Sequence, residues 1–405
     1  MSERPQSPPN PWGDLRGVRP VKVFSRLLRE GMTEEQAKSA MASFGVSSER
    51  AELCAEAAAA SGEVLRTLLP GDICLYIGIP FCPSRCSYCS FVTHSVQKAG
   101  KLVSPFIDVL KKEIVFAGAL MRESGLRLRA VYMGGGTPTT LTAAQLHDVF
   151  SCLSSNFDLG TVDEFTVEAG RPDTVDKEKL RVMKDAGANR VSINPQTFVP
   201  EVLCNIGRSH TVEDVYEKYA LARDEGLAVN MDLIAGLPGD TESGFARSLG
   251  CAADLGAVNI TVHNLAIKRG SRLNLEKAPL PDAAAVGRML DGAASALTGG
   301  GYRPYYLYRQ KRTAGGFENV GWSKPGHESI YNICIMEELC GILSLGGGGV
   351  TKMVDRETGY IVRTCNPKYP YEYNVGEEKI LDGKLEFFRF YSSSADRKGE
   401  QDVRA

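Results

Sequence analysis

The chain has 405 residues, enough for two or three domains, and its 43% hydrophobic and 24% charged residues are ordinary for a soluble globular protein. The net charge of -2 excludes an overall basic field that would recruit nucleic acid. No apolar run approaches the ~20 residues of a membrane span. The polar, Pro-rich N-terminus lacks a signal core, and the odd cysteine count argues against a disulfide framework. We therefore expect a cytoplasmic protein without a nucleic-acid or membrane partner.

The predicted elements begin with a helical segment. Residues 1–70 are expected to form a Pro-rich tail followed by two or three helices between residues 21 and 67. Thr33, followed by two glutamates, is a plausible N-cap for one of these helices, because its hydroxyl can accept a hydrogen bond from a free backbone N–H of the first turn.

The middle of the chain alternates strand-like and helix-like segments. Short β-rich runs are expected at 73–79, 130–133, 164–168, 190–194, 228–233 and 259–264. Helical patterns are expected at 104–124, 142–155, 175–186, 211–226, 241–256 and 282–299. This alternation predicts βαβ units around a parallel sheet. Six units could form either an open, partial barrel or a doubly wound sheet.

The last quarter of the chain has a different composition. Aromatic and β-branched residues increase from about residue 302, and tyrosines at 302, 305, 306 and 308 suggest strands or a substrate wall. A helix is expected over 330–343. We predict a C-terminal domain at 301–392 that covers the substrate, and a disordered charged tail at 393–405.

The most informative motif follows the first predicted strand. The run YIGIPFCPSRCSYC places Cys82, Cys86 and Cys89 in a CxxxCxxC spacing on one short loop. Soft thiolates select iron–sulfur clusters, zinc or copper, and three of them can hold three irons of a 4Fe-4S cluster while the fourth iron stays open for a small molecule. The alternatives are a zinc site completed by His94 and three free reduced thiols.

Polar or glycine-rich residues follow each later strand of the predicted sheet. In parallel α/β folds the carboxyl ends of the strands form the ligand-binding edge. Glycines allow a ligand to approach the backbone closely, so the turn after the second strand could pair its backbone groups with an amino acid. The residues concerned are the turn Gly134, Gly135, Gly136, Thr137 and Pro138, then Glu168, Gln196, Asp232 and His263.

Several longer sequence segments together resemble those of one known family. They include YIGIPFCPSRCSYCSF, YMGGGTPTTL, FTVEAGRPDT, MDLIAGLPGD and ITVHNLAIKRGSRL. The chain resembles the radical S-adenosylmethionine (SAM) superfamily, and within it the oxygen-independent coproporphyrinogen III oxidase family and its HemZ-like coproporphyrinogen dehydrogenase branch. The resemblance implies an α/β fold, a partial (β/α)6 barrel at 71–300 with a helical N-terminal segment and a smaller C-terminal α+β domain. Members of this branch usually carry extra residues ahead of the PWG segment, so an N-terminal domain is expected to be absent or truncated here.

The resemblance also implies the cofactors and their residues. A 4Fe-4S cluster would be held by Cys82, Cys86 and Cys89, and an electron donor such as flavodoxin or ferredoxin would reduce it. The residues that would surround SAM all lie either at the carboxyl ends of the strands or on the cysteine loop. They are Tyr76, Tyr88, Gly135, Gly136, Thr137, Glu168, Gln196, Arg208, Asp232 and His263. An ion pair remains the alternative role for Glu168, and the side chain of His263 could be incidental.

The predicted substrate is a tetrapyrrole. Coproporphyrinogen III carries four propionates, which arginine can pair in a bidentate way. The candidates are Arg269, Arg272, Arg303 and Arg309, and a solvated charged face is the alternative. The implied reaction is oxidative decarboxylation of propionates to vinyl groups, giving protoporphyrinogen IX, with no side chain assigned as a catalytic acid or base.

Two departures from the family leave the substrate open. Established oxidases have another cysteine two residues after the third, where this chain has Phe91. The heme-chaperone branch also lacks that cysteine, but it carries an HNxxYW heme-binding motif. This chain has YNICIM in that region, so the chaperone motif is missing as well. The alternatives are therefore another tetrapyrrole reaction, such as methyl transfer or ring opening, or a heme-binding chaperone.

The other eight cysteines receive no function, since free cysteine usually behaves as a small buried hydrophobe. Cys334 and Cys340 could in principle bind a metal, but two thiols alone do not close a site. The eight are Cys54, Cys74, Cys152, Cys204, Cys251, Cys334, Cys340 and Cys365.

Overall fold

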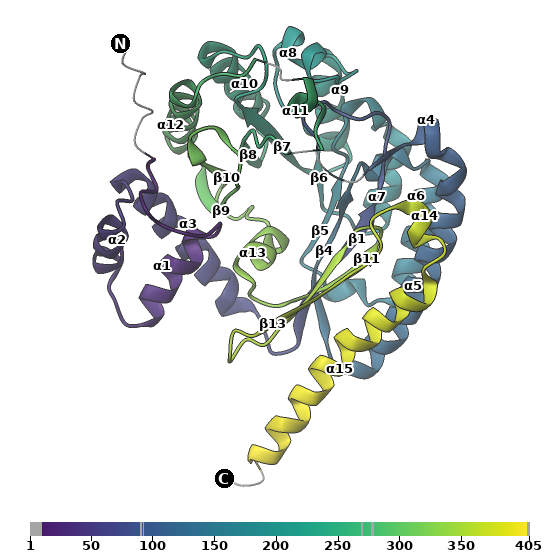
Figure 1. Ribbon diagram of the computed structural model, residues 1–405. Helices are drawn as coiled ribbons and strands as arrows, with labels where there is room; N and C mark the ends of the chain where they lie inside the picture. The colour runs from purple at the N-terminus through teal and green to yellow at the C-terminus, as the bar shows by residue number, and fades with distance from the viewer. Residues whose placement is uncertain (1–9, 90, 92, 269, 277–278, 403–405) are drawn as a thin grey trace, which may run out of the picture.

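Six parallel strands form the centre of the molecule in the computed structural model, which describes residues 10–402 apart from 90, 92, 269 and 277–278 (Figure 1). The strands are neighbours in chain order: β1 (Asp72–Ile79), β4 (Arg127–Gly135), β5 (Glu164–Glu168), β6 (Arg190–Ser192), β7 (Ala228–Ala235) and β8 (Asn259–Asn264). A helix follows each: α5 (Val103–Ser124), α6 (Ala143–Asn156), α7 (Lys177–Asp185), α9 (Val212–Asp224), α10 (Glu242–Leu255) and α12 (Ala283–Gly299). The sheet curves around an interior with these helices outside, which confirms the predicted partial barrel.

Side chains of the first strand alternate between two faces, as the strand period of two requires. Ile73, Leu75 and Ile77 join the large core that also contains the helices α5 and α6. Cys74 and Tyr76 belong to a second cluster on the other face, which is the barrel interior. The strand is buried on both faces, which is typical of a parallel sheet.

From residue 10 on, three helices precede the barrel: α1 (Pro20–Arg29), α2 (Glu34–Ser43) and α3 (Ser48–Thr67). The predicted cap is confirmed, because the Thr33 hydroxyl accepts from the N–H of Gln36 and the Gln36 side chain accepts from the N–H of Thr33. Glu318 ties this segment to the sheet: Trp12 donates to it at 2.6 Å, and Arg50 pairs with it at 2.9 Å.

Strands after the barrel extend the same sheet at both edges. β10 (Glu318–Ser323) pairs antiparallel with β8, and β9 (Arg303–Arg309) pairs antiparallel with β10. At the other edge β11 (Gly341–Gly346) lies parallel to β1 and is followed by β12 (Val350–Val354) and β13 (Ile361–Cys365). Between them α13 (Ile330–Glu337) lies inside the curved sheet (Figure 1). The C-terminal part therefore closes off the interior that the barrel strands leave open.

The helix predicted over 330–343 is wrong in its second half. It ends at Glu337, because Glu338 takes the left-handed conformation (φ 56°), and residues 341–346 form the buried strand β11. A short apolar run such as Ile342–Leu345 fits a buried strand or a buried helix equally well, and only its pairing with β1 decides between them.

The C-terminal end is helical. The short helix α14 (Pro370–Tyr373) is followed by the long helix α15 (Glu377–Asp402). We predicted disorder for residues 393–405, but α15 continues through residues 393–402, where no proline interrupts it. Residues 403–405 lie outside the described part of the chain. A buried ion pair between Lys384 and Glu113, at 3.0 Å, docks α15 against α5. Short elements complete the chain: β2 (Phe81–Cys82), β3 (His94–Ser95), α4 (Val96–Ala99), α8 (Pro200–Asn205) and α11 (Arg272–Glu276). Among the described residues, no helix combines the length and apolar character needed to cross a membrane.

Candidate functional site

The cysteine loop is held at the carboxyl end of β1 by backbone hydrogen bonds. The N–H of Gly136 donates to the carbonyl of Ile79 at 2.8 Å, and the N–H of Thr137 donates to that of Phe81 at 2.7 Å. Further along, the N–H of Ser87 donates to the carbonyl of Ile206 at 3.0 Å. The loop is thus fixed beside the glycine turn at the end of β4.

Two of the three loop thiols are partly accessible and one is buried. Cys86 is 8% exposed, and Cys82 and Cys89 are half-buried. Their sulfur atoms do not all lie within 4.8 Å of one another. Burial raises the pKa of Cys82, and it raises the pKa of Cys89 to about 11, so a metal that binds here must displace protons. Three separated thiols match the ligand set of a polynuclear iron–sulfur cluster.

The structure does not support a zinc site completed by His94. The imidazole packs edge-on against the rings of Tyr369 and Tyr371, at centroid distances of 5.9 and 6.4 Å. Among the described residues, His94 belongs to no set of three ligand atoms close enough to share one ion. A structural zinc ion needs four such ligands.

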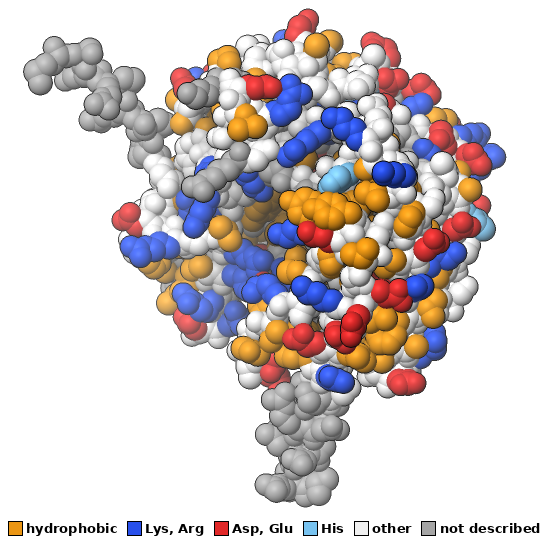
Figure 2. Space-filling view, turned by 45° about the vertical axis from the view of Figure 1, so that its right-hand side comes forward, with side chains coloured by type: hydrophobic (Ala, Val, Ile, Leu, Met, Phe, Trp, Pro, Cys, Tyr) orange, Lys and Arg blue, Asp and Glu red, His pale blue; other side chains and the backbone are white. Residues whose placement is uncertain are grey.

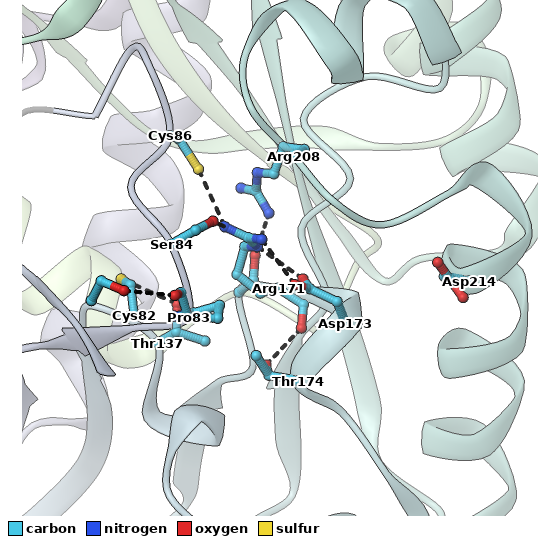
Figure 3. Close-up of polar contacts among 12 residues, drawn as sticks. Cys82, Pro83, Ser84, Cys86, Thr137, Arg171, Asp173, Thr174, Arg208 and Asp214 are labelled. Carbon is cyan, nitrogen blue, oxygen red and sulfur yellow. Dashed lines mark hydrogen bonds and ion pairs between the residues drawn. The ribbon is translucent and has the colours of Figure 1, made fainter. Parts of the chain in front are cut away.

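A buried arginine lies against the cluster loop, and the sequence analysis missed it. Figure 3 shows the Arg171 guanidinium between the cysteine loop and Asp173. Its Nη1 lies 3.6 Å from the sulfur of Cys86 and 3.1 Å from the hydroxyl of Ser84, while Nε and Nη2 each donate to the Asp173 carboxylate at 2.9 Å. Arg171 therefore places a positive charge beside the sulfur of Cys86. A single arginine in a loop carries no sequence signal for such a role.

The predicted glycine turn begins inside β4, whose last two residues are Gly134 and Gly135, and it packs tightly against the loop. Gly135 has φ 105°, a conformation that disfavours side chains. A Cβ added at Gly136 would clash with the carbonyl oxygen of Phe81. The hydroxyl of Thr137 donates to the sulfur of Cys82 at 3.5 Å (Figure 3). The turn thus leaves mainly backbone at the place where the strand ends meet.

Two carboxylates face the interior from β5 and β7, two strands that β6 separates. Glu168 accepts a hydrogen bond of 2.5 Å from the hydroxyl of Tyr132, and burial raises its pKa to about 7. Asp232 accepts from the amide of Asn194 at 2.9 Å, and its carboxylate lies 3.6 Å from Nε2 of His263. Tyr132 and Asn194 were not predicted; on sequence alone each is an ordinary residue of a buried strand or its end.

Arg208 contacts the cysteine loop, whereas Gln196 lies beside β7, where its N–H donates to the carbonyl of Asp232 at 2.9 Å. The Arg208 guanidinium donates to the Tyr88 hydroxyl at 2.9 Å and to the carbonyl of Gly170 at 2.9 Å. Gln196 has φ 68°, an uncommon conformation for a residue other than glycine, and its buried Oε1 has no hydrogen-bond partner in the described structure. A strained backbone and an unsatisfied buried oxygen together mark a position where a ligand donor fits.

Stacked tyrosines line the interior next to Glu168. The ring of Tyr132 stacks on Tyr331 of α13 at 4.4 Å, and Tyr76 stacks on both at 6.4 and 6.1 Å. On the far side, Tyr306 stacks on Tyr308 at 6.4 Å. The tyrosine-rich segment therefore forms the strand β9 and part of an aromatic wall.

The substrate arginines do not converge on this edge. Arg272 is exposed and pairs with Glu276 at 2.9 Å. Arg309 packs on the ring of Trp12 and donates to the carbonyl of Leu15 at 2.8 Å, so it holds the N-terminal segment. Arg303 lies level with the start of β8, at the opposite edge. Arg269 lies outside the described residues.

A partial (β/α)6 barrel with three thiols on one loop at its carboxyl edge defines the radical SAM class of protein. The model of the radical SAM superfamily matches residues 76–251. The fold resembles the solved coproporphyrinogen III oxidase (HemN) from Escherichia coli, with a TM-score of 0.63 and 23% identity over 80% of this chain and 72% of that one.

Similar proteins of known family show to which branch of the superfamily the chain belongs. The oxygen-independent coproporphyrinogen-III oxidase-like protein HemZ from Bacillus subtilis is 40% identical over 385 residues, 93% of this chain and 76% of the relative. The heme chaperone HemW from E. coli is 26% identical over 78% of this chain and 80% of the relative. The chain therefore belongs to the oxygen-independent coproporphyrinogen III oxidase-like family of the radical SAM superfamily. This superfamily uses a 4Fe-4S cluster and SAM, and the donor set described above fits both.

Proposed function

We propose that the protein is a radical SAM enzyme that oxidatively decarboxylates the propionates of coproporphyrinogen III to the vinyl groups of protoporphyrinogen IX. The observation that carries the proposal is the CxxxCxxC loop at the carboxyl edge of the barrel, in a chain 40% identical to HemZ over 93% of its length. The reduced cluster and SAM would supply the one-electron chemistry: removal of a hydrogen atom from a propionate, after which carbon dioxide leaves and one electron passes to a one-electron acceptor, so that a vinyl group remains.

In this proposal the cluster loop binds the metal. Cys82, Cys86 and Cys89 are the three ligands, and Thr137 and Arg171 donate to two of their sulfurs. Hydrogen bonds to ligand sulfur and nearby charge both tune the reduction potential of such a centre. A one-electron donor of the flavodoxin or ferredoxin kind would reduce it, and we place the protein in the cytoplasm.

The groups at the neighbouring strand ends would bind SAM. We assign the amino-acid moiety of SAM to the glycine turn, because Gly135 and Gly136 carry no side chain that would keep it from the backbone. Glu168 offers a carboxylate for a hydroxyl or an ammonium group. Gln196 offers its unpartnered Oε1, and Arg208 holds Tyr88 where an aromatic ring can stack on adenine.

The same interior and its surroundings suit a substrate with carboxylates on an apolar ring system. Figure 2 shows a hollow with hydrophobic side chains inside it and Lys and Arg side chains around its rim. The stacked tyrosines beside Glu168 form a wall that keeps water away from a reacting carbon. Lys268 lies over the ring of Phe91, 5.9 Å from its centroid, next to the cluster loop.

The test is an anaerobic assay of the reconstituted full-length protein with SAM, a reductant and coproporphyrinogen III, read by mass spectrometry. We expect protoporphyrinogen IX together with two molecules of 5′-deoxyadenosine per product, since two propionates react. The Cys86→Ala variant is the control and should produce neither. Cleavage of SAM without protoporphyrinogen would overturn the substrate and direct the search to methyl transfer or ring opening on another tetrapyrrole.

The second candidate is a heme-binding chaperone. It is favoured by the similarity to HemW and by Phe91, 66% exposed, at the position where established oxidases carry a further cysteine. Stoichiometric binding of heme without any turnover of SAM would support it and exclude the decarboxylase.

A further inference from the structure

Three cysteines far apart in the sequence meet inside the molecule, away from the cluster loop. Cys74 lies on β1, Cys334 on α13, and Cys340 directly before β11. Their sulfur atoms all lie within 4.8 Å of one another, with 3.7 Å between those of Cys74 and Cys340. All three side chains are buried, with at most 1% exposed.

This spacing suits one metal ion and not a cluster. Metal–thiolate bonds of about 2.3 Å place the sulfurs around a single ion roughly 4 Å apart. The core sulfurs already have nearly that separation. The loop sulfurs of Cys82, Cys86 and Cys89 do not all meet the same limit, as expected for ligands of different irons.

The surroundings restrict the kind of ion. No fourth His, Cys, Asp or Glu of the described residues shares the group, and the neighbours are apolar or aromatic side chains such as Leu68, Tyr331 and Ile342. Structural zinc needs four ligands, whereas hard cations need oxygen. Soft thiolates favour Cu(I), which three sulfur ligands can satisfy.

The thiols already contact one another before any ion is present, since the sulfurs of Cys74 and Cys340 lie within hydrogen-bonding distance at 3.7 Å. An ion would replace their S–H protons, which would leave to solvent as it binds.

We propose that Cys74, Cys334 and Cys340 form a three-coordinate binding site for a single thiophilic ion, Cu(I). The ion crosslinks β1, α13 and the start of β11, and so fixes α13 inside the barrel. The site does not depend on the proposed reaction, because none of its ligands belongs to the cluster loop or to the strand ends that would hold SAM.

The test uses the full-length chain with Cys82, Cys86 and Cys89 replaced by alanine, so that the loop cannot compete for copper. Under anaerobic conditions the protein is titrated with Cu(I) against a competing chelator, and the copper is examined by X-ray absorption. We expect one tightly held Cu(I) per chain with three sulfur neighbours. Copper with two sulfurs, with nitrogen ligands, or with no competition against the chelator would overturn the proposal.

Two matched variants of that protein assign the site. Cys334→Ala should weaken Cu(I) binding at least tenfold and abolish the rise in melting temperature that copper causes in the parent. Replacing the exposed Cys204 and Cys365 by serine should change neither. The opposite pattern would show that surface thiols bind the copper. If Cys334→Ala does not fold, the sulfur count in the parent still decides the question.

Discussion

The protein contains two sets of three cysteines that differ in nearly every physical respect. Cys82, Cys86 and Cys89 lie within one loop, and their sulfurs do not all fall within 4.8 Å of one another. Cys82 and Cys89 are partly accessible, whereas Cys86 is buried. Cys74, Cys334 and Cys340 come from three elements, are buried, and do fall within that distance. Donor type alone therefore does not define a metal site, because spacing and access decide whether the thiols suit several irons, one ion or none.

The environments of the two sets differ as well. The loop has a charged donor, Arg171, against one sulfur, and the carboxylates of Glu168 and Asp232 lie on β5 and β7 of the same sheet. The core set is enclosed by aliphatic and tyrosine side chains. A metal site with a free coordination position and polar surroundings can bind a ligand and convert it. A metal site enclosed by apolar side chains can only crosslink the elements that supply its ligands.

The largest effect is expected from Cys86→Ala. Losing one of three ligands should reduce formation of 5′-deoxyadenosine to the level seen without protein, while circular dichroism stays unchanged. Cys204→Ala, at an exposed thiol, is the matched control and should keep full activity. If Cys86→Ala still cleaves SAM, the loop is not the cluster site and the contrast between the two sets fails.

The second-largest effect is expected from removing the positive charge of Arg171. Arg171→Gln takes a positive charge from the sulfur of Cys86, 3.6 Å away, so the reduced cluster is less stabilised and its midpoint potential should become more negative. The potential is measured by electron paramagnetic resonance during a redox titration. Arg171→Lys keeps the charge and should restore most of the shift. An unchanged potential in the glutamine variant would show that Arg171 only braces the loop through Asp173.

Substitution of a cysteine in the core set should lower the stability of the folded protein. Cys334→Ala removes a buried sulfur and leaves a small cavity, which we expect to lower the free energy of unfolding by about 1–3 kcal/mol. Cys365→Ala, at an exposed position, should change it by less than about 0.5 kcal/mol. Denaturant unfolding of the metal-free protein measures both. Equal effects would remove the distinction between buried and accessible thiols.

The smallest effect concerns protons at the open site. Burial raises the pKa of Glu168 from 4.5 to about 7, so the folded state binds the proton more tightly than the unfolded state does. Ionisation of Glu168 therefore costs stability as pH rises from 4.5 to 7, and the full cost is present above pH 7.

Glu168→Gln removes that cost. At pH 8 the variant should be more stable than the parent, and the difference should nearly vanish at pH 4.5. It should also bind SAM more weakly at pH 8, because the carboxylate is lost. Thermal melting at the two pH values and equilibrium SAM binding measure these effects. A difference that is the same at both pH values would mean that Glu168 does not titrate in this range.

Much of the barrel could be predicted because its signals are local. Each βα unit shows its strand and helix over a window of about a dozen residues, and strand bounds such as 164–168 and 259–264 agree with the structure. The same holds for the Thr33 cap and for the CxxxCxxC loop, whose three thiols lie within eight residues. The end of the helix at Glu337 could not be predicted, since Ile342–Leu345 is apolar enough for either conformation.

By itself, the sequence determined the family, the cluster loop and the order of the six βα units, because each depends on residues close together in the chain. Only the tertiary structure decided which distant groups meet. Arg171 comes to Cys86 from another strand end, Arg309 is engaged by Trp12, and Cys74 reaches Cys340 across 266 positions through the pairing of β1 with β11. The reason is that long-range contacts follow from strand order and helix packing, which no local pattern records.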